Sequence, residues 1–356
     1  MLNRRNIVAG AALSAMGFRV HASAPGVAIT GVKIYPAPGE RPIIDGVVLI
    51  RGSQVVAVGR RASLAAPAGY RVVERPGEIL TAGFWNWHVH LTHPAFLRYE
   101  ASPDSVIQDE LDRDFTRWAF TTTFDLASTM AIASDLKSRL RRGRVRGPRL
   151  LSVGDPFYPP RATPIYAQSL YRDFNLPSAE VTSTVAAARR AALQIRNGAD
   201  AVKLFTGSIM GGPESTVHMD ADTVRAITDT AHRLGKRVFA HPTDEIGLQR
   251  AIQNGVDVLA HTMPLAGAWS PQFVRGLVKR RVALVPTLGL FASANNPATP
   301  VETALQQTRS FAEAGGQILF GTDAGFTEMF DTSDDMRLMH EAIGWKRHRA
   351  WLTTIR

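Results

Sequence analysis

The chain has 356 residues, which is enough for one large domain and a smaller accessory unit. Hydrophobic residues make up 45% and charged residues 20% of the sequence, so the composition excludes a disordered or fibrous chain. The net charge is +10, but no motif that interleaves basic and aromatic residues for nucleic-acid binding accompanies it. The absence of cysteine excludes disulfides, thiolate ligands and a cysteine nucleophile.

Residues 1–24 have the features of an export signal. Arg4 and Arg5 precede an apolar stretch over 7–18, and small residues suited to cleavage follow at 22–24. The arginine pair resembles a twin-arginine signal, with a Sec signal or an uncleaved anchor as the alternatives. Because the apolar stretch is short for a membrane span, we expect a periplasmic or secreted protein with no stable span in its mature form.

Residues 25–80 predict a small β domain. The segments VAITGVKIY and GVVLIRGSQVVAVG alternate valine and isoleucine with polar residues, and glycines interrupt them, which is typical of short strands joined by turns. We expect a β-sandwich-like unit at this end of the chain.

Residues 81–345 alternate apolar segments with helical ones. Helix start signals occur at Ser102-Pro103, at Asp220 and at Ser270-Pro271, where a capping side chain precedes an apolar-periodic run. Eight such strand–helix units predict an α/β fold with a closed (β/α)8 TIM barrel. The predicted strands are 83–90, 120–127, 149–154, 201–207, 237–241, 257–261, 282–287 and 317–323.

Five metal-ligating side chains fall at predicted strand ends. His88 and His90 are two residues apart on one strand, so both point to one face and can bind one ion, although an isolated pair is more often packing. His241, His261 and Asp323 each end a later strand, where barrel enzymes place their catalytic groups. A single histidine there could also cap a helix or bond a carbonyl, but five groups at one rim favour a metal site.

Lys203 lies within the apolar segment AVKLF and is expected to face the barrel interior. Burial lowers a lysine pKa, and the neutral amine can react with carbon dioxide to form a carbamate, which is an anionic oxygen ligand. The alternative is a buried lysine paired with Asp323 or another carboxylate.

In this order, the motifs GFWNWHVH, VKLFTG, VFAHP, VLAHT and FGTDAG resemble the amidohydrolase superfamily, in particular its imidazolonepropionase-like and prolidase-like branch. The resemblance covers residues 27–341 and implies two divalent ions bridged by a carboxylated lysine. Zinc is the favoured metal for nitrogen and oxygen ligands, and Mn, Co or Fe would also fit. Carried over, His88, His90 and Asp323 would bind one ion and His241 and His261 the other, with Lys203 as the bridge.

The resemblance implies hydrolysis of a C–N bond in an amide, a cyclic amide or a dipeptide. A metal-activated hydroxide would attack the carbonyl carbon, and Asp323 would move a proton to the leaving nitrogen. We expect a small-molecule or dipeptide substrate and no nucleic-acid partner, and a homo-oligomer stays open. The alternatives are a mononuclear deaminase-like hydrolase, in which Lys203 is not a ligand, and an inactive truncated paralogue with only a binding role.

Substrate contacts are expected from the rim loops. The long segment 155–178 is rich in Pro, Tyr and Arg, and long loops at this face of a barrel often cover the active site. The candidates are Tyr158, Arg161, Ser208 and Thr287. The alternative for each is an ordinary loop residue with no role in substrate binding.

The end of the chain departs from the resemblance. Family members continue well beyond the Asp of the eighth strand and return to complete the β unit, whereas few residues follow Asp323 here. Residues 346–356 form an atypical basic tail. We therefore expect a C-terminally truncated member, or one with a shifted reading frame, whose β unit is incomplete; a natural short variant is the alternative.

Overall fold

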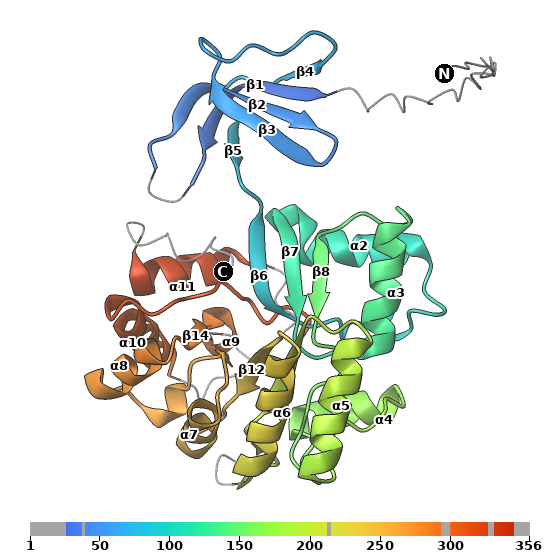
Figure 1. The fold of residues 1–356 in the computed structure, drawn as a ribbon, viewed down its shortest axis with the longest axis vertical. Coiled ribbons are helices and arrows are strands. Elements are labelled where there is room, and N and C mark those ends of the chain that lie inside the picture. The colour runs from blue at the N-terminus through green and yellow to red at the C-terminus, as the bar shows by residue number, and fades with distance from the viewer. Residues whose placement is uncertain (1–25, 38–39, 212–214, 293–299, 327–330, 345–356) are drawn as a thin grey trace, which may run out of the picture. The chain divides into compact units, whose positions relative to one another are not determined.

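The computed structural model of the chain describes residues 26–37, 40–211, 215–292, 300–326 and 331–344 (Figure 1). The expected export signal over 1–24 and the basic tail over 346–356 lie outside the described residues. Two compact units divide between Thr81 and Ala82. Within the described residues no helix has the length and apolar character needed to span a membrane.

The first unit is a five-stranded sheet, as the alternating valines predict. Its strands are β1 (Val27–Tyr35), β2 (Ile43–Arg51), β3 (Gln54–Arg60), β4 (Arg71–Glu74) and β5 (Ile79–Thr81). The order is β3-β2-β1-β4, and β5 pairs with the far end of β1. Alternate residues of β1 are buried because a strand turns successive side chains to opposite faces. Gly52, with φ of +59°, makes the tight turn between β2 and β3.

The second unit contains two parallel sheets with helices around them. One sheet has the order β6 (Phe84–Val89), β7 (Phe120–Asp125), β8 (Arg149–Ser152). The other has the order β14 (Ala283–Val285), β13 (Val258–Ala260), β12 (Arg237–His241), β9 (Ala201–Phe205). Seven of the eight predicted strands are therefore present, and the α/β class is confirmed.

The eighth predicted strand, over 317–323, differs from the prediction. It joins the two sheets through isolated bridges, Leu284 to Ile318 on one side and Val89 to Ala324 on the other. Its hydrogen bonds change partner along its length, from Leu284 in β14 to Trp87 and His88 in β6, so neither neighbour forms a regular ladder with it. Between β8 and β9 the described residues show no ladder, and the strands form two joined sheets rather than one closed barrel ladder.

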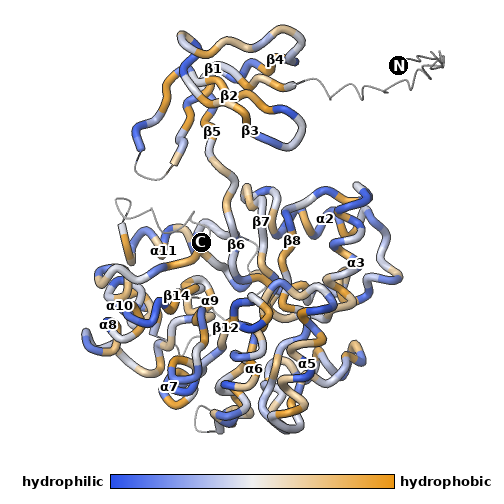
Figure 2. Tube along the Cα trace, viewed as in Figure 1, coloured by the Kyte–Doolittle hydropathy of each residue, from blue (hydrophilic) through white to orange (hydrophobic). Residues whose placement is uncertain are grey.

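The helices of the second unit alternate with its strands, and polar and apolar residues alternate along them (Figure 2). As predicted, Asp220 and Ser270 cap helices, whereas the helix after Ser102 begins at Asp104 with Pro103 at its N-cap and no side-chain cap. The helices are α1 (Pro94–Leu97), α2 (Asp104–Asp114), α3 (Met130–Arg141), α4 (Ile165–Asp173), α5 (Thr184–Arg196), α6 (Ala221–Arg233), α7 (Glu245–Gln253), α8 (Pro271–Lys279), α9 (Leu288–Ala292), α10 (Val301–Glu313) and α11 (Ser333–Ile343). A short hairpin, β10 (Gly207–Ile209) and β11 (Thr216–His218), follows β9.

The interior between the strands is aromatic. Trp85 stacks on Trp87 with ring centroids 4.9 Å apart, Trp87 stacks on Phe124 at 5.9 Å, and Phe124 packs against Phe239 at 5.1 Å. Because these rings come from β6, β7 and β12, they join both sheets in one apolar core. Trp87 in this core directly precedes His88 in the chain.

Candidate metal centre

The backbone of the second unit bends where the predicted ligands lie. The pairing of β6 with β7 changes register between Asn86 and Val89, around His88. His261 and Asp323 directly follow the apolar runs of their segments and have positive φ angles of 94° and 62°. Such conformations are uncommon for residues other than glycine and occur where the surrounding structure imposes them, often at functional sites.

Three ligand atoms converge in a tight group. The Nε2 atoms of His88 and His90 are 3.2 Å apart, and they lie 3.0 Å and 2.8 Å from Oδ1 of Asp323. Zinc binds imidazole nitrogens and carboxylate oxygens at about 2.0–2.2 Å, so atoms that share one ion lie about 3 Å apart. The three separations therefore fit one divalent cation.

The other two histidines extend this group into a chain of imidazoles. The ring of His261 lies 4.6 Å from that of His88 and 4.8 Å from that of His241. His241 stacks on Phe205, with centroids 4.6 Å apart and planes at 17°. The four predicted histidines thus meet at one place, although only His88 and His90 share the tight group with Asp323.

A hydrogen-bonded hydroxyl fixes the tautomer of His261. Its Nδ1 lies 2.7 Å from Oγ1 of Thr287, and that hydroxyl donates its own hydrogen to the carbonyl of Pro286 at 2.8 Å. The Thr287 oxygen must therefore accept from Nδ1–H, which leaves the lone pair on Nε2 of His261 available for a metal.

Lys203 is buried, with 1% of its surface exposed, and no hydrogen bond or ion pair holds its amine within the described residues. The expected alternative, a direct pair with Asp323, is therefore not seen. Burial lowers the pKa of Lys203 to about 7, although the carboxylates of Asp323 and Asp125 oppose this shift. The amine is close enough to lower the pKa values of His88, His241 and His261.

Burial keeps the imidazoles of His88, His241 and His261 neutral. Burial lowers the pKa of His88 to about 3, and it lowers the pKa values of His241 and His261 well below the ordinary value. Burial alone would raise the pKa of Asp323, but the imidazoles of His88 and His90 lower it well below the usual range. Neutral imidazoles and an ionised carboxylate are the forms that bind divalent cations. Buried Nδ1 of His88 has no hydrogen-bond partner among the described residues, so the ring is held by packing and, at Nε2, by Asp323.

An amide side chain joins the two segments that carry the tight group. Asn86 donates from Nδ2 to Oγ1 of Thr322 at 2.8 Å, and its Oδ1 accepts from the backbone nitrogens of Thr322 and His88 at 3.2 Å and 3.3 Å. Sequence reasoning missed this residue, because an asparagine inside an apolar strand gives no indication of its distant partner.

No protein-family model and no curated protein sequence matches this chain. Solved structures do match it. One is an amidohydrolase, with a TM-score of 0.73, 19% identity, and coverage of 91% of this chain and 85% of that one. Another is a prolidase complexed with N-methylphosphonate-L-proline, with a TM-score of 0.71, 20% identity, and coverage of 92% and 85%. The third is an ochratoxinase from A. niger, with a TM-score of 0.71, 18% identity, and coverage of 92% and 83%.

The chain shares the fold of these hydrolases. The expected resemblance to prolidase-like and amidohydrolase-like proteins is thus confirmed at the level of the fold. The tight group of His88, His90 and Asp323 adds a possible metal site within that fold.

The four candidate substrate contacts have different surroundings. Tyr158 is buried against Phe205, with ring centroids 4.8 Å apart, and burial raises its pKa well above the ordinary value. Arg161 is exposed, and its backbone nitrogen donates to Glu180 at 3.1 Å. Ser208 is buried without a hydrogen-bond partner for its hydroxyl among the described residues. Only Thr287, through His261, contacts the histidine chain by a hydrogen bond in the described structure.

Two further rim histidines are paired with acidic side chains. Nε2 of His218 lies 2.8 Å from Asp244, which caps α7, and Nδ1 of His93 lies 3.4 Å from Glu110 in α2. These pairs give both histidines structural partners outside the chain of imidazoles.

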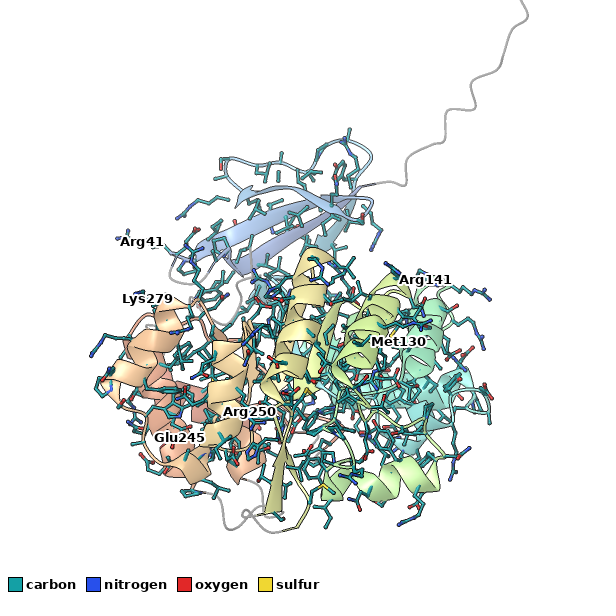
Figure 3. The ribbon with its side chains drawn as sticks, turned by 60° about the horizontal axis from the view of Figure 1, so that its bottom comes forward. Arg41, Met130, Arg141, Glu245, Arg250 and Lys279 are labelled. Carbon is teal, nitrogen blue, oxygen red and sulfur yellow. The ribbon has the colours of Figure 1, made fainter. Side chains whose placement is uncertain are left out.

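A cavity of about 270 Å³ lies elsewhere, between α3 and the end of α5. Met130 and Arg141, labelled in Figure 3, are the two ends of α3 and both line it. Lys137 also lines the cavity and is paired with Asp200 at 2.7 Å. Because none of the six predicted ligands lines this cavity, it is separate from the candidate metal centre.

Proposed function

We propose that the chain is a metal-dependent amidohydrolase that cleaves a C–N bond in an amide, a cyclic amide or a dipeptide. The observation that carries the proposal is the convergence of His88, His90 and Asp323, with their ligand atoms 2.8–3.2 Å apart, beside the buried amine of Lys203. The shared fold with an amidohydrolase and a prolidase supports the same reaction class.

The proposed cofactor is a pair of divalent ions, with zinc as the metal. His88, His90 and Asp323 would hold one ion, and His241 and His261 the other. When bound, the ions would lower the pKa of a water molecule and polarise the scissile carbonyl. Nitrogen and oxygen donors without any thiolate suit zinc, as well as Mn, Co or Fe.

Lys203 is proposed to carry a carbamate that bridges the ions. Its pKa of about 7 leaves a large neutral fraction near neutral pH. The neutral amine would form a bond to the carbon of carbon dioxide and release one proton, which leaves a carbamate anion. An anion at this position would replace the unpaired buried ammonium with a group that attracts cations.

Asp323 is proposed as the residue that moves the proton. Its Oδ1 faces the two histidines, and no hydrogen bond among the described residues engages Oδ2. Since the carboxylate is ionised, it can take a proton from the attacking water and give it to the leaving nitrogen, which an amide needs because its amine is a poor leaving group.

The test measures metal content per chain and hydrolysis of a panel of dipeptides, N-acyl amino acids and lactams. We expect two zinc ions and turnover in the wild type. Asp323→Asn keeps the shape of the side chain and should lower turnover by about a thousandfold or more because the base is lost. Wild-type activity that survives complete removal of metal would contradict the proposal.

A mononuclear deaminase-like hydrolase is the second candidate. It is favoured by the fact that only His88, His90 and Asp323 form a tight group, while His241 and His261 lie outside it. One ion per chain and release of ammonia would select this reaction. A Lys203→Ala variant that keeps two ions would contradict the bridging role of Lys203. A wild-type chain that binds no metal and shows no turnover would have a binding role alone.

We also propose that the barrel is closed, that the chain has two domains and that it is exported. Closure of the two sheets into a (β/α)8 barrel is supported by the segment 317–324, which bridges β14 and β6. Residues 25–80 and 81–345 would be the β domain and the hydrolase domain. Residues 1–24 would direct export to the periplasm or outside the cell, and cell fractionation with and without them tests this.

A further inference from the structure

The turn that carries Phe326 is fastened to the residues that follow β6. The carbonyl of Ala324 accepts from the backbone nitrogen of His90 at 2.7 Å. The Thr92 hydroxyl donates to the carbonyl of Gly325 at 2.5 Å. These bonds fix the backbone of the turn relative to His90, so the ring of Phe326 has a defined place beside the candidate metal centre.

The ring of Phe326 lies next to a proposed ligand and is open to solvent. Its centroid is 6.2 Å from that of the His90 imidazole, with the planes at 64°. The residue is 44% exposed, and within the described part of the chain no other phenylalanine and no tryptophan is exposed. An apolar ring left in water is stabilised when another apolar group covers it.

Tyr166 in α4 extends this apolar surface. Its ring packs edge to face on Phe326, with centroids 5.0 Å apart and planes at 70°, and the residue is 38% exposed. The two rings come from segments far apart in the chain and form one exposed aromatic surface that adjoins His90. An exposed apolar surface beside a polar site is typical of a place where a ligand binds.

The histidines that solvent reaches have phenylalanine neighbours. The side chain of His90 is 11% exposed, whereas that of His88 is fully buried. His241 is also partly exposed, and its ring stacks on Phe205 at 4.6 Å. A ligand that approaches the centre from either of these histidines therefore meets an aromatic ring, and on the His90 side the ring of Phe326 is uncovered.

We propose that Phe326 is a specificity-determining residue that packs against an aromatic ring of the substrate, so that the site prefers amides with a phenyl group next to the scissile bond. This inference rests on the proposed hydrolysis of a C–N bond and names the substrate class of that reaction. A phenyl group would cover the exposed side of Phe326 and gain both buried apolar area and a ring–ring contact. A methyl group in its place would gain little of either.

The experiment compares wild type, Phe326→Ala and Phe326→Leu as zinc-loaded full chains. Calorimetry measures binding of benzylphosphonate and methylphosphonate, which offer the same phosphonate group and differ by one phenyl group. We expect the wild type to bind benzylphosphonate about tenfold more tightly, and Phe326→Ala to reduce this preference to about twofold. Phe326→Leu keeps an apolar side chain without the ring and should retain part of the preference.

Leu193 offers a matched control. It is an exposed apolar side chain, 56% exposed, in the last turn of α5, which leads to the start of β9, whereas the proposed ligands lie where strands end. Leu193→Ala therefore removes exposed apolar surface from the same unit and should keep the wild-type preference within about twofold. All four proteins should bind equal zinc, because neither side chain is a proposed ligand.

Equal affinities of the wild type for the two phosphonates would overturn the inference, and so would a zinc-loaded wild type that binds neither. A preference that Phe326→Ala leaves intact, or that Leu193→Ala lowers equally, would also overturn the role of Phe326.

Amide hydrolysis by the wild type is measured separately, on dipeptides and N-acyl amino acids with and without a phenyl group. Turnover that shows no preference for the phenyl compounds overturns the inference and leaves the proposed reaction in place. A preference for benzylphosphonate that depends on Phe326, without turnover of any amide, supports the aromatic contact and overturns the proposed reaction.

Discussion

The hydrogen bond between Thr287 and His261 shows how one hydroxyl can prepare a metal ligand. Because the Thr287 oxygen accepts from Nδ1–H, the lone pair of His261 is on Nε2, and the ring cannot rotate without losing the bond. Sequence inspection pointed to Thr287 as a rim residue near substrate. Its position next to His261 could not be predicted, because it depends on the positive φ angles of both residues, 46° and 94°.

Thr287→Val should weaken metal binding at this histidine. Valine has nearly the same shape but cannot accept from Nδ1–H, so the tautomer and ring orientation of His261 are no longer fixed. We expect the zinc affinity to fall by about 10-fold to 100-fold, measured by competition with a chelator. Thr287→Ser keeps the hydroxyl and should restore most of the affinity, and an unchanged affinity in Thr287→Val would contradict this role.

Asp335 in α11 makes the stability of the chain depend on pH. Burial raises its pKa to about 8, although its Oδ1 accepts from the backbone nitrogen of Gly289 at 2.8 Å, and Asp323 and Asp334 raise the pKa further. The folded state therefore holds a proton that the unfolded state releases near its ordinary pKa of 3.8. The stabilisation is complete below that value and is lost as the pH rises towards about 8.

Asp335→Asn should remove this dependence, because the amide has no charge and can still accept from Gly289. We expect similar melting temperatures for both proteins at pH 5, and a variant that is more stable by about 3 °C or more at pH 8.5. Thermal unfolding at both pH values checks the prediction. A difference of the same size at both would show that the effect comes from packing.

At the scale of elements, the segment 317–324 holds Asp323 in place without forming a regular strand. The bonds of Asn86 to Thr322 fasten it to β6, and Gly325 allows its close approach, since a Cβ there would lie 1.9 Å from the carbonyl oxygen of His90. The sequence predicted a ligand at the end of this segment because FGTD follows an apolar run. It could not predict the irregular pairing, which results from neighbours far away in the chain.

Asn86→Ala should loosen this connection. The backbone amides of Thr322 and His88 would lose their acceptor, and the Thr322 hydroxyl would keep only the backbone nitrogen of Ala324, at a cost of about 1–3 kcal/mol in the free energy of unfolding. Zinc binding should weaken as well, because Asp323 is then less firmly placed beside His88. A double-mutant cycle with Thr322→Val checks the coupling, and additive effects of the two changes would argue against a direct connection.

The helices and strands themselves were largely predictable from periodicity and capping. Asp220 and Ser270 begin helices because their side chains accept from the first turn, a local interaction visible in sequence. The contact of Glu180 with the backbone nitrogens of Arg161 and Thr163 was not predicted, because it spans too much chain for sequence patterns to reveal.

For the whole molecule, metal and folding should be coupled. The second unit buries neutral imidazoles and the amine of Lys203 together, an arrangement that a bound cation and a carbamate would stabilise. Zinc at a hundred times its dissociation constant adds about 2.7 kcal/mol and should raise the melting temperature by about 5–10 °C. Chelation should reverse the shift in calorimetry, and His90→Asn, which lacks one ligand of the tight group, should respond less than the wild type. A wild type whose melting is indifferent to zinc would contradict the coupling.

The stacked indoles of Trp85 and Trp87 give the molecule a built-in optical reporter. Two transition dipoles 4.9 Å apart couple as an exciton, so they should give a paired band in the circular dichroism spectrum. The pair sits in the chain immediately before His88, and the sequence has no tryptophan before Trp85. Spectroscopists can therefore follow the surroundings of His88 through this signal, without a dye and without interference from the N-terminal sheet.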